Sequence, residues 1–364
     1  MSPNYRICWS SGFSREMPPK GGTPAQTMNI NLRETLHKDS RTPMRFSAIL
    51  AFLTLAGCTA SLADMANRSE NSPSKPAASG PAHDPQAVSA AYPKPELLVE
   101  PVDLAKRASA AQFVVLDARS RKAFDETRLP GARWVDAAKW AKAFGSGKDV
   151  KAWSGQIGDL GVAADSKVVV YDDNFSKDAA RTWWILRYWG LTDVRLLNGG
   201  WQGWKKAGLP LEAGKAQAIA AKVFRAVPQA KRLAMKEQIL NALNDQSLQI
   251  VDARCQAEFC GIDKQTNKRG GAIPGAKQLE WIDLIDKPTQ RFKTADQIRA
   301  LFQKAGIELG KPTATHCQSG GRSSVMAFVM ELMGAAEVSN YYAGWGEWGN
   351  VDDTPIVAKK AEKR

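Results

Sequence analysis

Short apolar runs alternate with helical periods along the chain from about residue 113 onward. Runs rich in β-branched residues predict buried strands at 113–117, 168–171, 250–251 and 312–316. Apolar residues at helical spacing predict helices at 150–160, 179–189, 294–305 and 321–333, with Thr294 as the N-cap of the third. This alternation is typical of an α/β fold in which a mainly parallel sheet is covered by helices on both faces.

The chain repeats its own motifs. The matching pairs are Asp117-Ala-Arg119 and Asp252-Ala-Arg254, Pro130-Gly-Ala132 and Pro274-Gly-Ala276, Leu160-Gly-Val162 and Ala305-Gly-Ile307, and Gly200-Trp-Gln-Gly-Trp204 and Gly344-Trp-Gly-Glu-Trp348. The first pair is offset by 135 residues and the others by 144 or 145. The chain is therefore a duplicated domain, with about nine residues inserted after the first motif of the second copy.

The repeats and the composition divide the chain into six segments. Residues 58–96 are rich in Ala, Ser and Pro without an apolar period, which is typical of a flexible tether. The expected segments are a targeting segment at 1–57, the tether at 58–96, a first domain at 97–212, a linker at 213–232, a second domain at 233–358 and a tail at 359–364.

The residues before the tether predict a signal peptide. Met44-Arg45 is followed by an apolar run at 46–55, which is too short to span a membrane as a mature helix. The run ends in Leu55-Ala-Gly-Cys58, which resembles the bacterial lipobox. The resemblance implies cleavage before Cys58, a lipid on its thiol, and a periplasmic protein anchored to a bacterial membrane. Residues 1–43 lack any folding pattern, so we expect the true start at Met44. An ordinary secretory signal with a chance cysteine is the alternative.

Charge and residue counts exclude several classes of function. The net charge is +13, and residues 1–57 hold seven basic and three acidic residues, so the rest carries about +9. This charge is spread along the chain without a basic stripe, which argues against nucleic-acid binding. His316 is the only histidine of the expected folded part, so we expect no metal site. Whether Cys255 and Cys260 form a disulfide stays open.

Cys317 stands where a predicted strand meets a predicted helix. It is followed by Gln318, Ser319, Gly320, Gly321, Arg322 and Ser323. The glycines let the backbone N–H groups point inward, and the helix start and Arg322 add positive charge. Such a loop lowers a thiol pKa and can hold a persulfide anion, so Cys317 is the expected nucleophile rather than an inert buried cysteine.

These motifs resemble the two-domain rhodanese family of thiosulfate and 3-mercaptopyruvate sulfurtransferases over residues 97–352. The second copy has the family's Cys loop, and Tyr342-Ala-Gly-Trp-Gly-Glu-Trp348 resembles its closing motif. The resemblance implies an inactive first domain, with Asp172 opposite Cys317. It also implies a persulfide on Cys317, a small sulfur donor, cyanide or a thiol as acceptor, no cofactor, and a monomer.

The choice of donor is open between thiosulfate and 3-mercaptopyruvate. Ser319 matches the mercaptopyruvate enzymes, but the first copy lacks the histidine that they use. A family arginine that contacts substrate would fall at Glu258, and Lys268 and Arg269 are the expected substitutes. The Cys-x-x-Gly-x-Arg loop is closer to single-domain rhodaneses, which favours thiosulfate.

Two rival functions remain. A cysteine phosphatase signature needs five residues between Cys and Arg, whereas four separate Cys317 from Arg322. A non-catalytic binding module would need no intact Cys loop. We also expect partial burial between the two copies to protect Cys317 from oxidation.

Overall fold

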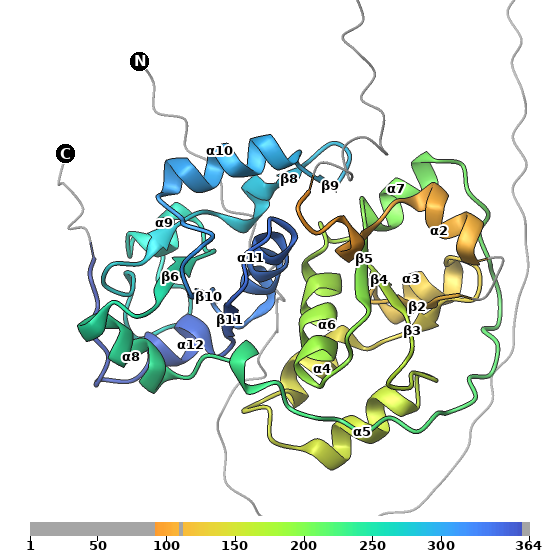
Figure 1. Cartoon of the computed structure of the whole chain (residues 1–364). Helices are drawn as coiled ribbons and strands as arrows, with labels where there is room; N and C mark the ends of the chain where they lie inside the picture. The colour runs from red at the N-terminus through yellow and green to blue at the C-terminus, as the bar shows by residue number, and fades with distance from the viewer. Residues whose placement is uncertain (1–91, 109–111, 359–364) are drawn as a thin grey trace, which may run out of the picture. The chain divides into compact units, whose positions relative to one another are not determined.

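Two parallel sheets, one in each repeat, organise the structure, a computed structural model in which residues 92–108 and 112–358 are described (Figure 1). The predicted fold class, an α/β fold with a mainly parallel sheet in each of two repeats, is confirmed. In the described ranges no helix is long and apolar enough to cross a membrane. The expected signal peptide and Cys58 lie outside these ranges.

The first repeat has a five-stranded sheet in the order β1-β5-β4-β2-β3, with every neighbouring pair parallel. Its strands are β1 (Leu98–Val99), β2 (Val114–Asp117), β3 (Arg133–Trp134), β4 (Val168–Tyr171) and β5 (Val194–Leu197). Its helices are η1 (Pro95–Leu97), α2 (Pro101–Ala108), α3 (Arg121–Glu126), α4 (Ala137–Ala143), α5 (Val150–Gly158), α6 (Lys177–Tyr188) and α7 (Gly200–Lys206). All four residues of β4 are buried, as a central strand covered on both faces requires.

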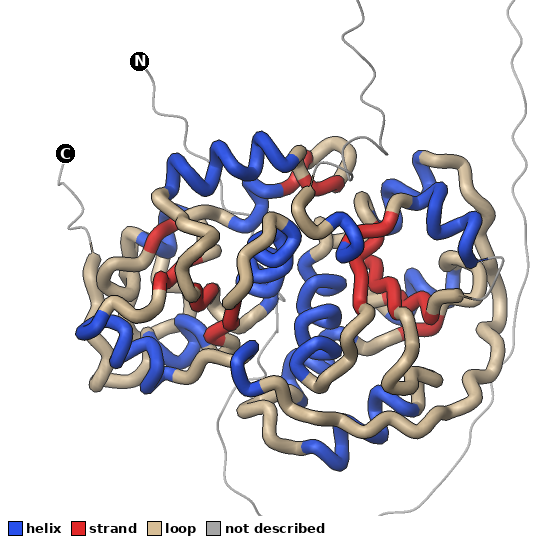
Figure 2. Tube along the Cα trace, viewed as in Figure 1, coloured by secondary structure: helices blue, strands red, loops and turns tan. Residues whose placement is uncertain are grey.

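The second repeat has a four-stranded parallel sheet in the order β11-β10-β6-β7 and a separate antiparallel pair, β8 and β9. Its strands are β6 (Gln249–Asp252), β7 (Lys277–Gln278), β8 (Ile285–Asp286), β9 (Arg291–Phe292), β10 (Thr313–His316) and β11 (Val338–Tyr341). Its helices are η2 (Ala230–Arg232), α8 (Lys236–Asp245), α9 (Gln256–Phe259), η3 (Trp281–Leu284), α10 (Ala295–Ala305), α11 (Gly321–Leu332) and α12 (Gly344–Trp348). Figure 2 shows the same alternation of helix and strand in both repeats.

The predicted elements are present, with small shifts at their ends. Thr294 caps α10 by accepting a hydrogen bond from the Gln297 amide at 3.3 Å. Pro312 stands just outside β10, because proline has no N–H to give to the sheet. Among the four-residue strands, β5 and β11 were not predicted, because the polar residues Arg195 and Ser339 interrupt their apolar runs. The two-residue strands of the described chain were not predicted either.

Helices α6 and α11 pack against each other, and one hydrophobic core includes residues of both repeats. The segment that joins the repeats follows the first one closely. The amides of Val227 and Gln229 donate to the carbonyls of Trp189 and Tyr188 at 3.0 and 2.7 Å. The amide of Phe292 also donates to Asn198 Oδ1 at 3.1 Å. The loop that begins α11 therefore borders the first repeat.

Candidate active site

Cys317 directly follows β10, and Gly320 is the N-cap of helix α11, in the left-handed conformation at φ +85°. A Cβ on Gly320 would lie 2.4 Å from the ring of Tyr342, so only glycine fits there. The sulfur lies at the carboxyl edge of a parallel sheet, where ligands bind in open α/β folds.

The start of α12 fixes the direction of the loop backbone. The amides of Trp345 and Gly346 donate to the carbonyls of Cys317 and Gln318 at 2.8 and 2.9 Å. Gly344 permits this approach, since its Cβ would lie 2.3 Å from the Cys317 carbonyl oxygen. Because these carbonyls accept hydrogen bonds from α12, they point away from the sulfur, and the amides of Ser319 and Ser323 point toward it.

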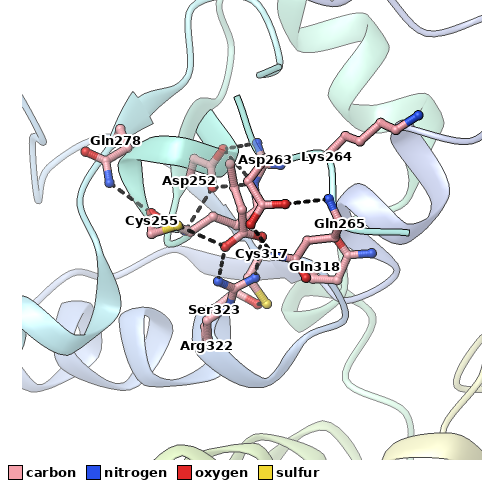
Figure 3. A network of polar contacts seen from close by, with 12 residues as sticks. Asp252, Cys255, Asp263, Lys264, Gln265, Gln278, Cys317, Gln318, Arg322 and Ser323 are labelled. Atoms are coloured by element: carbon pink, nitrogen blue, oxygen red, sulfur yellow. Dashed lines mark hydrogen bonds and ion pairs between the residues drawn. The ribbon is translucent and has the colours of Figure 1, made fainter. Parts of the chain in front are cut away.

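The Cys317 thiol is buried, with 2% of the residue exposed. Burial raises the pKa of the thiol, but the Arg322 guanidinium, the Ser323 hydroxyl and the amides of Ser319 and Ser323 outweigh it, so the pKa of Cys317 is lowered. The Ser323 hydroxyl lies 3.5 Å from Cys317 Sγ (Figure 3). The loop therefore favours a thiolate in a site largely closed to solvent.

Arg322 is not free to bind a substrate with its whole guanidinium. Its two terminal nitrogens pair with the Glu258 carboxylate at 2.5 and 2.9 Å, and only 4% of the Glu258 side chain is exposed. Glu258 belongs to α9, so this pair connects the Cys317 loop to the segment after β6. This role of Glu258 was not predicted, because the sequence shows only that Glu258 stands where the family has an arginine.

The inserted residues of the second copy clamp the loop. The side-chain amides of Gln318 and Asn267 exchange two hydrogen bonds, of 2.9 and 3.1 Å. The Asn350 amide donates to Asn267 Oδ1 at 2.8 Å. Asn267 was also missed, since nothing in the sequence pairs it with Gln318.

Lys268 and Arg269, the expected substitutes for a substrate arginine, lie in the same insertion. Lys268 is exposed. The Arg269 guanidinium donates to carbonyls of the closing segment, including those of Trp348 and Thr354 at 2.9 and 3.0 Å. Among the described residues neither side chain contacts Cys317, and Arg269 serves to hold the closing segment.

Asp172 occupies the same place in the first repeat, after β4. Its Oδ1 accepts from the amides of Asn174 and Ser176 at 3.0 and 2.9 Å, and its Oδ2 accepts from those of Asp178 and Ala179, both at 2.8 Å. Burial and Asp178 raise the pKa of Asp172 to about 7 against the effect of these donors. The first repeat thus keeps a carboxyl group in an amide cradle.

A buried ion pair lies beneath each loop. Asp252 binds Arg254 in the second repeat at 2.6 Å, and Asp117 binds Arg119 in the first at 2.6 Å. His316 Nε2 lies 3.4 Å from Asp252 Oδ2, and burial lowers the pKa of His316 to about 4. It is therefore a neutral packing residue at physiological pH rather than a cation.

Other candidate chemistry is set apart from Cys317. Cys260 is a free thiol, so no disulfide joins it to Cys255. No cluster of three or more potential metal ligands occurs among the described residues. A cavity of about 720 Å³ opens at the other end of β10, where Pro312, Arg187 and Arg232 line it.

The sequence is similar to known proteins over both repeats. The family model of the rhodanese-like domain matches residues 100–207 and 235–350. The thiosulfate sulfurtransferase of Azotobacter vinelandii is 31% identical over 264 residues, which are 71% of this chain and 96% of that protein. The 3-mercaptopyruvate sulfurtransferase of Escherichia coli K12 is 32% identical over 204 residues, 56% of this chain and 72% of that protein.

Solved structures agree in fold. The 3-mercaptopyruvate sulfotransferase of Escherichia coli superposes with a TM-score of 0.61 at 26% identity, covering 69% of this chain and 99% of that one. The anaerobic ergothioneine biosynthesis enzyme of Chlorobium limicola has a TM-score of 0.64 at 22% identity, covering 74% of this chain and 72% of that one, and it supports the fold alone.

Proposed function

This chain belongs to the rhodanese family and is a sulfurtransferase, and on that premise we propose that Cys317 carries the transferred sulfur as a persulfide, with thiosulfate as the donor. The observation that carries the proposal is the loop itself. The amides of Ser319 and Ser323 and the charge of Arg322 converge on a buried thiol whose pKa they lower. The same groups stabilise the anionic end of a persulfide.

The reaction is a double displacement. The Cys317 thiolate attacks the outer sulfur of thiosulfate, a bond forms between Sγ and that sulfur, and the bond to the sulfonate sulfur breaks, so that sulfite leaves with the electron pair. An acceptor, cyanide or a thiolate, then attacks the outer sulfur. The Sγ–S bond breaks and its electron pair returns to Cys317, and no external oxidant or reductant is consumed.

The test compares Cys317 with Cys260, the thiols that are free in the described part of the chain. We expect Cys317→Ala to abolish both thiocyanate formation and the gain of one sulfur atom in the intact mass after thiosulfate treatment, because the sulfur has no other carrier. Cys260→Ala should keep both. Undiminished sulfur transfer by Cys317→Ala would overturn the proposal.

3-Mercaptopyruvate is the second candidate donor. Ser319 favours it, since mercaptopyruvate enzymes have serine at this place in the loop. The pairing of Arg322 with Glu258 does not favour it, because a carboxylate donor would meet a second buried carboxylate there. Turnover measured on both donors under identical conditions decides between them, and a ratio that favours mercaptopyruvate would reverse the assignment.

We further propose that the protein is a periplasmic lipoprotein, on the strength of the apolar run at 46–55 and of Leu55-Ala-Gly-Cys58. Expressed in a bacterial host with a labelled fatty acid, the protein should incorporate label and fractionate with membranes. Cys58→Ser should lose the label. A protein that is secreted without label would instead carry an ordinary signal peptide.

A further inference from the structure

Arg181 lies on α6 in the first repeat and touches the catalytic loop of the second. A Cβ added to Gly321 would lie 2.3 Å from Arg181 Nη2 and 3.0 Å from its Cζ, so the guanidinium rests directly on the loop backbone. Arg181 Cζ also lies 5.9 Å from the centre of the Tyr342 ring, which packs on Gly320. The inactive repeat thus brings a positive charge to the active one.

This charge has no counter-ion in the described part of the chain. No carboxylate pairs with Arg181 there, and its buried Nε has no hydrogen-bond partner. A buried arginine donor is seldom left without a partner, because an unpaired buried donor destabilises the folded state. Arg322, by contrast, is already paired with Glu258.

The surroundings connect Arg181 with the sulfur. Tyr342 is buried, and burial is the main reason why the pKa of its hydroxyl is raised. The Arg181 guanidinium lowers this pKa and the Cys317 thiolate raises it, so both charges act on the same hydroxyl. Arg181 itself is only partly buried, so a solute can reach it. A planar guanidinium suits the oxygen atoms of a sulfonate.

We propose that Arg181 binds the oxyanion end of the sulfur donor and holds the sulfite that leaves, so that the inactive repeat determines which donors the active repeat accepts. The proposal rests on the sulfur transfer proposed above for Cys317. It assigns the donor's negative charge to a residue of the first repeat, in place of the arginine that Glu258 displaces.

The experiment compares two donors in Arg181→Met and Arg181→Lys. The donors are thiosulfate, which has a sulfonate, and the persulfide of 2-mercaptoethanol, which has none. We expect Arg181→Met to raise KM for thiosulfate by about tenfold or more with a smaller change in kcat, since a charge-assisted hydrogen bond contributes about 1.5–3 kcal/mol. Persulfide loading from the alkyl persulfide should stay within about twofold, and Arg181→Lys should restore part of the affinity for thiosulfate.

Arg187→Met is the matched control. Arg187 lies on the same helix, is partly buried and also has an unpartnered Nε, but it pairs with Glu331 at 3.9 Å and lines the cavity at the other end of β10. Its replacement should leave KM for thiosulfate unchanged. Thermal unfolding of each variant checks that α6 and α11 remain packed.

Sulfite separates this inference from the proposed donor. Sulfite should inhibit loading from the alkyl persulfide in the unmodified protein, and Arg181→Met should weaken that inhibition. If the unmodified protein accepts the alkyl persulfide but not thiosulfate, the donor assignment fails while the sulfite result still tests Arg181. Equal losses with both donors, or unchanged thiosulfate KM and sulfite inhibition, would show that Arg181 only supports the loop.

Discussion

The loops after β4 and β10 are two versions of one anion cradle. At the offset of 145 residues, the amides of Asn174 and Asp178, which bind Asp172, correspond to those of Ser319 and Ser323, which bind the Cys317 sulfur. The Asp172 carboxylate places two oxygen atoms one bond beyond Cγ, and a persulfide places one sulfur atom one bond beyond Sγ. The first repeat therefore holds permanently a group of the size that the second repeat is proposed to hold for part of each cycle.

The two loops differ in whether the group that the amides hold can be transferred to another molecule. Asp172 cannot give up its oxygen atoms, whereas an S–S bond at Cys317 can be broken by a nucleophile. The active loop also has Arg322 and the clamp of Asn267 on Gln318, which comes from residues inserted in the second copy. The sulfur transfer proposed for Cys317 thus combines a cysteine, a nearby cation and a hydrogen-bonded support, on a backbone that both copies share.

Removing the cation should have the largest effect on this comparison. Arg322→Met should raise the pKa of Cys317 and slow its reaction with thiosulfate at neutral pH by roughly 10- to 100-fold, because the thiolate loses the positive charge that lowers its pKa most. The variant should be combined with Glu258→Gln, so that no buried carboxylate is left unpaired. The measurement is the pH dependence of iodoacetamide alkylation together with turnover.

The control is Lys177→Met, which changes the position in the first repeat that corresponds to Arg322. Its turnover should match that of the unmodified protein. An unchanged alkylation profile in the Arg322→Met and Glu258→Gln double variant would mean that the amides alone keep the thiol ionised.

Replacing the Asp172 carboxylate in the amide cradle of the first repeat should destabilise the folded protein. Asp172→Asn turns an NH₂ group toward amides that need an acceptor, so we expect a loss of about 1–3 kcal/mol in the free energy of unfolding. Urea unfolding measures it, with the exposed Asp165→Asn as control. A variant as stable as the control would show that the carboxylate is dispensable and that the likeness of the two cradles has no energetic weight.

Exchanging the residue before the loop should give the smallest effect. Tyr171 in the first repeat corresponds to His316 and donates to Asp117. The pKa of His316 is lowered from 6.5 to about 4, so the unfolded chain binds more protons in this range and stability is lost as the pH falls from 6.5 toward 4. His316→Tyr should reduce that loss, as measured by thermal unfolding between pH 7 and 4.5. An identical decline in both proteins would place the acid sensitivity elsewhere.

Much of the fold and the centre of the site were predictable from the sequence. The repeated Asp-Ala-Arg and Gly-Trp motifs gave the duplication, the apolar runs gave β4 and β10, and Gly320 and Gly321 after Cys317 marked an inward-facing loop. These features are local, since strand and helix periods and the left-handed preference of glycine are set by neighbouring residues. Strands β5 and β11 were not predicted, because their mixture of polar and apolar residues did not indicate strands buried on both faces.

The partners of the charges were decided by tertiary structure alone. The sequence by itself determined that Cys317 follows a strand, begins a helical turn and is flanked by Arg322. Only the fold decided that Glu258 neutralises Arg322, that Arg269 holds the closing segment, and that Arg181 of the other repeat rests on Gly321. The reason is physical: a charge acts through distance and solvent exclusion, and both arise when segments far apart in the chain are packed together.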